Sequence, residues 1–327
     1  MQPNHPGNRL HYGDNLSVLR AHVADASVDL IYLDPPFNSN ASYGILFKEP
    51  DGRASTAQIE AFEDTWHWND VAEDAFDQVA RSGHTRAFDL LNALRAFLGD
   101  NDMMAYLAMM AVRLLELHRV LKETGSLYLH CDPTASHYLK LLLDGVFGVQ
   151  FYHNEIIWKR TSAHGNVSTN YGDVTDSIFF YSKGTKPVWN RPMMPLSDRN
   201  IETKYNMVDA AGRRFTTRDL RNPGVRPNLP YQYPASNGIT YHPHPNGWSF
   251  TREKMQAYDE AGLLHFPREA SGRLRLKLYL DESAGQPRQT LWDDIPPINS
   301  QAQERLGYPT QKPLALPGAR CMVPSAR

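Results

Sequence analysis

The string Asp34-Pro35-Pro36-Phe37 combines groups that could make an amino nitrogen on a base ring reactive. Such a nitrogen is a poor nucleophile because its lone pair is delocalised into the ring. A carboxylate that accepts one N–H and a backbone carbonyl that accepts the other free the lone pair for a methyl donor. The prolines have no N–H and hold that carbonyl, and the aromatic ring can stack on a base that has left the helix. The string therefore predicts amino methylation, with a plain strand-ending turn as the alternative.

The elements around this string predict an α/β fold. Residues 28–33 (VDLIYL) are typical of a buried strand that stops at the prolines, and ligands of open α/β sheets bind at such strand ends. Apolar residues recur at helical spacing over 102–122, and we expect Gly125 to end this helix. The next expected elements are a strand at 126–131, a helix at 134–146, and strands at 155–159 and 177–181. This alternation predicts a parallel sheet covered by helices.

Two stretches lack this regularity and suggest the domain organisation. Residues 38–85 are polar and too long for a simple connection, so we expect a mobile loop there. Its Trp66 and Trp68 either close over a substrate or anchor the loop to the core. Residues 191–247 are rich in Pro, Asn and Arg, and they indicate an irregular insertion. The predicted organisation is a catalytic part at 1–190, an inserted region at 191–290 and a return segment at 291–327.

Charge is distributed unevenly along the 327 residues. The formal net charge is -2, but residues 1–150 carry -9, residues 151–290 carry +6 and residues 291–327 carry +1. A basic middle suits a polyanionic partner. Five arginines lie in the fourteen residues 213–226, with Asp219 as the single acid. The candidate DNA contacts are Arg213, Arg214, Arg218, Arg221 and Arg226. A solvated loop with internal ion pairs is the alternative.

Composition excludes several other classes of protein. With 41% hydrophobic and 21% charged residues, the chain is expected to fold as a globular protein. No apolar run is long enough to cross a bilayer, and residues 1–13 lack a secretion signal, so we expect a cytoplasmic protein. Cys131 and Cys321 cannot make a disulfide framework. The histidines, His130 among them, lack the spacing of a zinc site, and no metal is expected.

At Asp34-Pro35-Pro36-Phe37 and in several other segments, the chain resembles the amino-methylating DNA methyltransferases, which act on adenine N6 or cytosine N4. The matching segments are HYGDNL at 11–16, RVLK at 119–122, GSLYLH at 125–130, EIIWK at 155–159, FFYSK at 179–183, LWDDI at 291–295 and YPTQKP at 308–313. The order of DPPF before TQKP is similar to the permuted, beta-type subgroup that includes type III modification subunits. Asp34 at the first motif position is more typical of adenine enzymes, whereas many cytosine-N4 enzymes carry Ser there.

The resemblance implies a Rossmann-like sheet, S-adenosylmethionine as the cofactor and double-stranded DNA as the substrate. Asp34, Pro35, Pro36 and Phe37 match the catalytic motif. The residues that it implies for the cofactor pocket are Asp14, Asp34, Thr310, Gln311, Lys312 and Pro313. It also implies that region 191–290 recognises the target sequence, and that a restriction subunit or a second copy of the chain is among the partners.

The chain departs from the subgroup after residue 313. There the subgroup continues through a helix and a strand to a glycine-rich turn around the methionine part of the cofactor. Here Pro317 and Gly318 interrupt the expected helix, and the sequence has no Gly-x-Gly. We therefore expect a truncated C-terminus, which leaves strand 28–33 as an unprotected edge. The rival functions are a DNA-binding remnant that cannot hold the cofactor, and methylation of RNA or of protein glutamine.

Overall fold

The computed structural model divides the chain into two units. The described residues are 7–37, 42–48, 54–63, 66–162, 169, 171–269, 272–299, 301–306 and 311–318. Unit 1 comprises residues 1–192 and 289–327, and unit 2 comprises residues 193–288. None of the described helices is long and apolar enough to cross a membrane.

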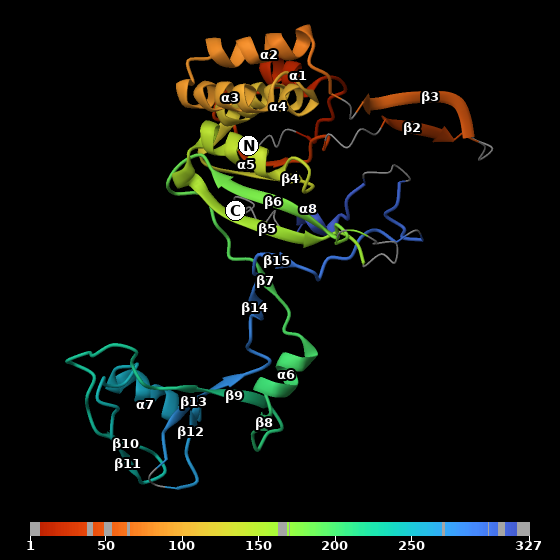
Figure 1. Cartoon of the computed structure of the whole chain (residues 1–327). Coiled ribbons are helices and arrows are strands. Elements are labelled where there is room, and N and C mark those ends of the chain that lie inside the picture. Colours follow the sequence, from red (N-terminus) through yellow and green to blue (C-terminus); the bar gives the residue numbers. More distant parts are fainter. Residues whose placement is uncertain are drawn as a thin grey trace, which may run out of the picture. The chain divides into compact units, whose positions relative to one another are not determined.

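Unit 1 is built on a sheet whose described strands follow the order β1-β4-β6-β5-β15. Figure 1 labels β4, β6, β5 and β15 of this sheet. The strands are β1 (Val28–Leu33), β4 (Leu121–Cys131), β5 (Tyr152–Lys159), β6 (Thr175–Ser182) and β15 (Leu291–Trp292). β1 is parallel to β4 and β15 is parallel to β5, but β6 is antiparallel to both of its neighbours. The α/β class is confirmed, and the expectation of a parallel sheet is wrong. Since β6 follows β5 in the chain and pairs directly with it, the two strands need only a loop between them.

Helices cover this sheet in unit 1. They are α1 (Asn15–His22), α2 (Asp70–Arg81), α3 (Thr85–Leu98), α4 (Asp102–Val120) and α5 (Ser136–Phe147), with the short η1 (Val149–Phe151) and α8 (Ala315–Gly318). Within the described part of the sheet, β1 has its ladder partner in β4 and lies at the edge.

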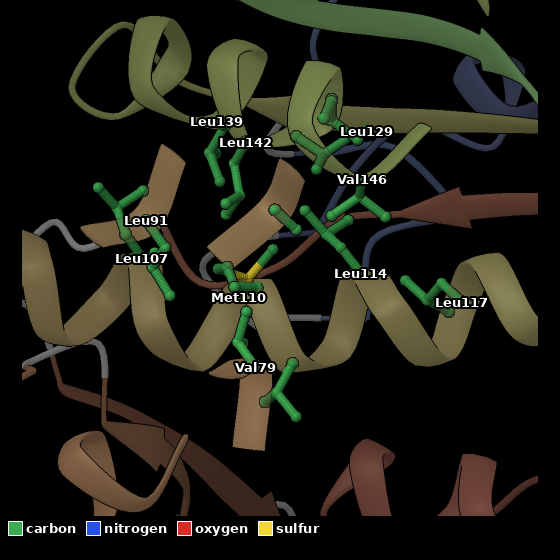
Figure 2. Close-up of a cluster of buried hydrophobic side chains, with 14 of the residues drawn as sticks. Val79, Leu91, Leu107, Met110, Leu114, Leu117, Leu129, Leu139, Leu142 and Val146 are labelled. Atoms are coloured by element: carbon green, nitrogen blue, oxygen red, sulfur yellow. The ribbon is translucent and has the colours of Figure 1, made fainter. Parts of the chain in front are cut away.

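α4 runs through the core of unit 1 (Figure 2). Its Leu107, Met110, Leu114 and Leu117 recur three or four residues apart and therefore share one face of the helix. The same buried cluster contains Val79, Leu91, Leu129, Leu139, Leu142 and Val146, which come from α2, α3, β4 and α5. Full burial of one leucine side chain contributes about 1.5–3 kcal/mol. This cluster therefore holds β4, whose far end borders the site, firmly against the helices.

Gly125 does not end α4. The helix stops at Val120, and the backbone is already extended at Leu121 with φ -73° and ψ 136°. Gly125 lies within β4, where a Cβ atom would approach the Leu121 Cγ to 2.7 Å. The prediction of a helix cap is wrong, because the glycine is required by a close approach inside the strand.

Residues 38–85 contain more regular structure than their composition predicts. β2 (Ser42–Lys48) and β3 (Ala54–Glu63) pair antiparallel, and α2 follows with Asn69 as its N-cap. Trp66 and Trp68 pack against the core of unit 1. The Trp68 Nε1 donates to Glu73, and the Arg95 guanidinium lies 4.2 Å from its ring centre. Of the two roles considered for these tryptophans, the structure shows the anchor.

Unit 2 has its own sheet and its own core. Its elements are β7 (Met193–Met194), α6 (Asp198–Lys204), β8 (Met207–Val208), β9 (Arg214–Asp219), β10 (Tyr233–Pro234), β11 (Thr240–Tyr241), α7 (Arg252–Glu260), β12 (Leu264–His265), β13 (Arg275–Tyr279) and β14 (Gln286–Pro287). The main sheet has the order β12-β13-β9-β8, and β7 pairs with β14 where the chain enters and leaves the unit. The core combines the aromatic side chains of Tyr233, Tyr241 and Trp248 with leucines such as Leu220 and Leu264.

Candidate active site

The tip of β1 carries the string Asp34-Pro35-Pro36-Phe37. β1 and β4 are parallel neighbours, with Leu33 paired to Leu129, so the ends of both strands meet at one edge of the sheet. Pro35 is buried, whereas the Asp34 side chain keeps 27% of its surface exposed. The carboxylate therefore stands on a fixed backbone at the edge where ligands of α/β sheets bind.

Lys312 contacts both Asp34 and Phe37. Its Nζ lies 3.0 and 3.1 Å from the two carboxylate oxygens of Asp34 and 4.7 Å from the centre of the Phe37 ring. The structure thus brings together two residues of the expected catalytic string and one residue of the expected cofactor segment. The Lys312 ammonium shows that an N–H donor fits between this carboxylate and this ring.

The segment that carries the lysine is fixed by its surroundings. Gln311 donates a hydrogen bond to the backbone carbonyl of Glu304. Pro313 is buried, and Leu316 is fully buried in an apolar cluster with residues of β4, β5 and β6. Thr310 lies outside the described residues. The Asp34–Lys312 contact is therefore supported by packing on both of its sides.

A buried histidine lies next to Asp34, and the sequence singled it out only as a candidate core or surface residue. His130, near the end of β4, is fully buried. Its Nδ1 lies 2.7 Å from the Tyr32 hydroxyl and 3.9 Å from the Asp34 carboxylate, and its Nε2 lies 2.9 Å from the buried carboxylate of Asp176. The sequence feature that could have identified His130 is its position: a polar residue at the end of an apolar strand beside the catalytic strand.

Hydrogen bonding and burial determine the protonation of His130. Burial lowers the pKa of the imidazole, and this effect exceeds the opposing effects of the Asp176 hydrogen bond and the Asp34 charge. An ionised carboxylate only accepts hydrogen bonds, so Nε2 carries the hydrogen and donates it to Asp176. Nδ1 is left to accept from the Tyr32 O–H. The imidazole is therefore neutral, with one defined tautomer.

Asp14 belongs to a second group of polar residues in unit 1. Its carboxylate accepts from the Ser17 backbone N–H as the N-cap of α1 and forms an ion pair with Arg113 of α4. Burial by itself would raise the pKa of this carboxyl, but Arg113 and the N–H groups of the first helical turn outweigh it and lower the pKa. Asp14 is thus an ionised acceptor.

A small cavity connects this second group with the prolines. It encloses about 40 Å³ and is lined by Asn15, Leu33, Pro35, Pro36, Trp66, Met109, Met110 and Arg113. It has mainly apolar walls and one guanidinium beside the Asp14 carboxylate. Pockets for drug-sized ligands measure about 300–1,000 Å³, so this cavity admits a small part of such a molecule.

The structure separates the five candidate arginines of unit 2 into two groups. Arg213 forms ion pairs with Asp281 and Glu282. Arg214 donates to two backbone carbonyls at the end of α6, and the Arg218 guanidinium lies 5.4 Å from the centre of an aromatic ring. These three side chains therefore have contacts within unit 2.

Arg221 and Arg226 are exposed, and Arg221 borders a cavity of unit 2. This cavity encloses about 290 Å³, and its lining includes Arg221, Arg273, Asp219, His242, His244 and Trp248. Arg273 lies outside the arginine-rich segment, so the sequence did not reveal it. Across the described part of the chain, no group of three or more His, Cys, Asp or Glu side chains could hold a metal ion.

Two curated proteins are similar to this chain in sequence. The type II methyltransferase M.EcaI of Enterobacter cloacae is 29% identical over 211 residues, which cover 64% of this chain and 45% of the relative. The Mod subunit of the type III restriction-modification enzyme StyLTI of Salmonella typhimurium is 28% identical over 321 residues, which cover 93% of this chain and 44% of the relative. The chain thus spans less than half the length of these curated relatives.

Solved structures give weaker similarity. The cytosine-N4-specific PvuII DNA methyltransferase aligns with 54% of this chain and 49% of its own, with 13% identity and a TM-score of 0.30. The sequence model of the DNA methylase family, in contrast, matches residues 28–319, from the first residue of β1 to just beyond α8. Since this match spans most of the chain, the protein belongs to the DNA methylase family.

Proposed function

We propose that this chain carries the catalytic site of a site-specific DNA methyltransferase. It transfers a methyl group from S-adenosylmethionine to the amino group of a flipped base, adenine N6 in the first place and cytosine N4 as the alternative. The observation that supports this proposal best is the contact of the Lys312 ammonium with the Asp34 carboxylate beside the Phe37 ring. An N–H donor on a flat base would need the same carboxylate and the same aromatic face.

Each residue of the string has a separate task in the proposed reaction. Asp34 accepts one N–H of the target amine and the Pro35 carbonyl accepts the other, so the nitrogen lone pair turns away from the ring. The tandem prolines keep that carbonyl in place. Phe37 stacks on the base. Lys312 has to leave the carboxylate when the base enters, because both occupy the same acceptor.

Residues on the other side of the prolines would bind the cofactor. When bound, S-adenosylmethionine supplies an electrophilic methyl group on a sulfonium. The ionised Asp14 carboxylate suits the hydroxyl or amino groups of such a molecule, and Trp66 and the methionines of the small cavity suit its flat base. We also assign Thr310, Gln311, Lys312 and Pro313 to this pocket, because Lys312 contacts Asp34 and the other three are its neighbours in the chain.

Unit 2 is the proposed DNA-recognition region. Arg221 and Arg226 are exposed, Arg221 borders the cavity of about 290 Å³, and Arg273 adds a further guanidinium at that cavity. Guanidinium groups bind phosphates and guanine edges in two-pronged geometry. Arg213 and Arg214 remain candidates, but replacing them would also disturb contacts that hold unit 2 together.

Replacing Arg221 and Arg226 with alanine should reduce the salt dependence of DNA binding. The logarithm of the binding constant falls with the logarithm of salt concentration by about 0.9 per neutralised phosphate, so the double variant should lose about one to two units of slope. Fluorescence anisotropy at several salt concentrations measures this. Arg81→Ala/Arg86→Ala in unit 1 removes the same charge and serves as the control. Equal slopes for the two double variants would contradict the assignment.

The experiment that tests the proposed function combines binding and chemistry. Calorimetric titration with S-adenosylmethionine should give heat, and DNA incubated with the chain and labelled cofactor should acquire the label. Mass spectrometry of the digested DNA should then yield N6-methyladenine, and N4-methylcytosine would select the alternative base. DNA binding without heat and without label would indicate a DNA-binding remnant and overturn the proposal.

The names of the relatives suggest a partner. Three of the curated relatives are Mod subunits of type III restriction-modification enzymes. We therefore propose a restriction subunit as a partner. A homodimer and a cytoplasmic location remain predictions from the sequence.

A further inference from the structure

His130 contacts residues on the strands that surround the Asp34 carboxylate. Its ring lies 5.6 Å from the Phe37 ring and 5.7 Å from the Trp158 ring, measured between ring centres. Its nitrogens contact Tyr32 on β1 and Asp176 on β6. One side chain of β4 thus contacts residues of β1, β5 and β6 as well as the ring that would stack on the base.

The charged groups that face His130 come from every element packed against it. Asp34 follows β1, Asp176 lies on β6, and Lys312 comes from the return segment. Arg160, just after β5, lies 3.2 Å from the second oxygen of Asp176. Tyr32 on β1 adds a hydroxyl, 2.7 Å from the His130 Nδ1. The two carboxylates favour an imidazolium, whereas Lys312 and burial oppose it.

We infer that His130 is a positioning residue for the proposed methyl transfer: as the neutral tautomer it leaves the Asp34 carboxylate to the target amine, and as an imidazolium it takes that carboxylate away. This inference rests on the proposed function. In the neutral form Nδ1 has only a lone pair, which already accepts from Tyr32, so it offers Asp34 no hydrogen bond at 3.9 Å. A protonated Nδ1 would donate, and a small movement of Asp34 would bring its oxygen into a charge-assisted hydrogen bond.

The consequence is a defined loss of activity on the acid side. The rate at saturating DNA and cofactor should rise with pH as His130 loses its proton, with a midpoint below the ordinary histidine value of about 6.5. Binding of DNA and of cofactor should change less than the rate, because the competition concerns only the orientation of Asp34. The part of the pH–rate profile in which the rate falls toward acid pH is its acid limb. His130→Asn, which has no titrating group, should lower the rate and remove this acid limb.

Two conservative variants should shift the limb in opposite directions. Asp176→Asn keeps an oxygen for the Nε2–H but removes the negative charge that favours the imidazolium, so the limb should move about one pH unit lower. Tyr32→Phe removes the hydrogen bond to the neutral form, so the limb should move about one pH unit higher. A role in packing alone would lower the rate at every pH and leave the midpoint unchanged.

The control is a second histidine of unit 1, which is partly buried. His118 on α4 has its pKa lowered to about 4 by burial and by nearby cationic groups, and it packs against Phe147. His118→Asn should leave the acid limb in place. If its limb moves as far as those of the Asp176 and Tyr32 variants, the shift reports general destabilisation and the inference is wrong.

A second measurement does not depend on catalysis. Nitrogen NMR of histidine-labelled chain, assigned with His130→Asn, should show one imidazole with a protonated Nε2 and an unprotonated Nδ1 at neutral pH, titrating below about 6.5. Asp176→Asn and Tyr32→Phe should shift this titration in opposite directions. If the wild-type chain transfers no methyl group, the proposed function fails while this titration still tests the imidazole. If it transfers methyl with a limb that neither variant moves, the inference alone fails.

Discussion

Asp34→Ala should lower the rate of methyl transfer to DNA by about 10²–10³-fold or more. The substitution removes the acceptor that draws the amine nitrogen out of conjugation, and loss of one such electrostatic partner in a transition state usually has an effect of this size. The rate of the Asp34→Asn variant should fall between those of the wild-type chain and of Asp34→Ala, because asparagine keeps an acceptor oxygen but loses the charge. Transfer of labelled methyl groups under single-turnover conditions measures the chemical step directly.

The matched control for Asp34→Ala is Asp29→Ala. Asp29 is also an aspartate of the β1 region, but it is exposed and pairs with Lys122 away from the site. Its loss should leave the rate within about twofold, since exposed ion pairs contribute at most about 1 kcal/mol. DNA affinity measured by anisotropy should be similar for both variants. An Asp34→Ala chain that methylates as fast as the Asp29→Ala chain would show that the amine is activated elsewhere.

Leu114→Ala should destabilise the protein by about 2–5 kcal/mol. Leu114 is fully buried at the centre of α4, where it belongs to the cluster that joins four helices and β4 (Figure 2). Truncation removes contacts on several sides and leaves a cavity that the surrounding elements cannot close. Urea denaturation followed by circular dichroism should give a lower midpoint. A fall in Tm of about 2–4 °C per kcal/mol is expected for a unit of this size.

Leu141→Ala provides the comparison for this effect. Leu141 lies on the neighbouring helix α5 but is 44% exposed, so the same chemical change removes far less buried surface. Its loss should cost less than about 1 kcal/mol. Equal losses from the two substitutions would mean that burial on α4 is not what stabilises unit 1.

Strongly patterned elements of the fold were predictable from the sequence. The strand at 28–33 coincides with β1, and the helix expected over 102–122 is α4, which ends at Val120. The direction of β6 was not predictable, because an apolar run carries no information about whether its neighbour is parallel. The helix α2 was missed although Asn69 caps it and Ala72, Phe76 and Val79 recur at helical spacing. The polar residues before it and the charged residues between its apolar positions concealed the pattern.

The site was predictable in part. The string at Asp34 carries its own chemistry, so residue types alone indicated the acceptor and the stacking ring. The contact between Asp34 and Lys312 joins residues 278 positions apart, and only resemblance to a family suggested that the two segments meet. His130 and Asp176 were not predicted as a pair, because a hydrogen bond between neighbouring strands depends on register. Register follows from packing that no short motif contains.

The pairing of β7 with β14 has a consequence for how such proteins diversify. These two short strands bring the first and last residues of unit 2 together as neighbours. A module whose ends already meet can be exchanged for another of different length without altering the distance between its attachment points. With the role proposed for unit 2, exchange of this module would change the DNA sequence preference and leave unit 1 unchanged.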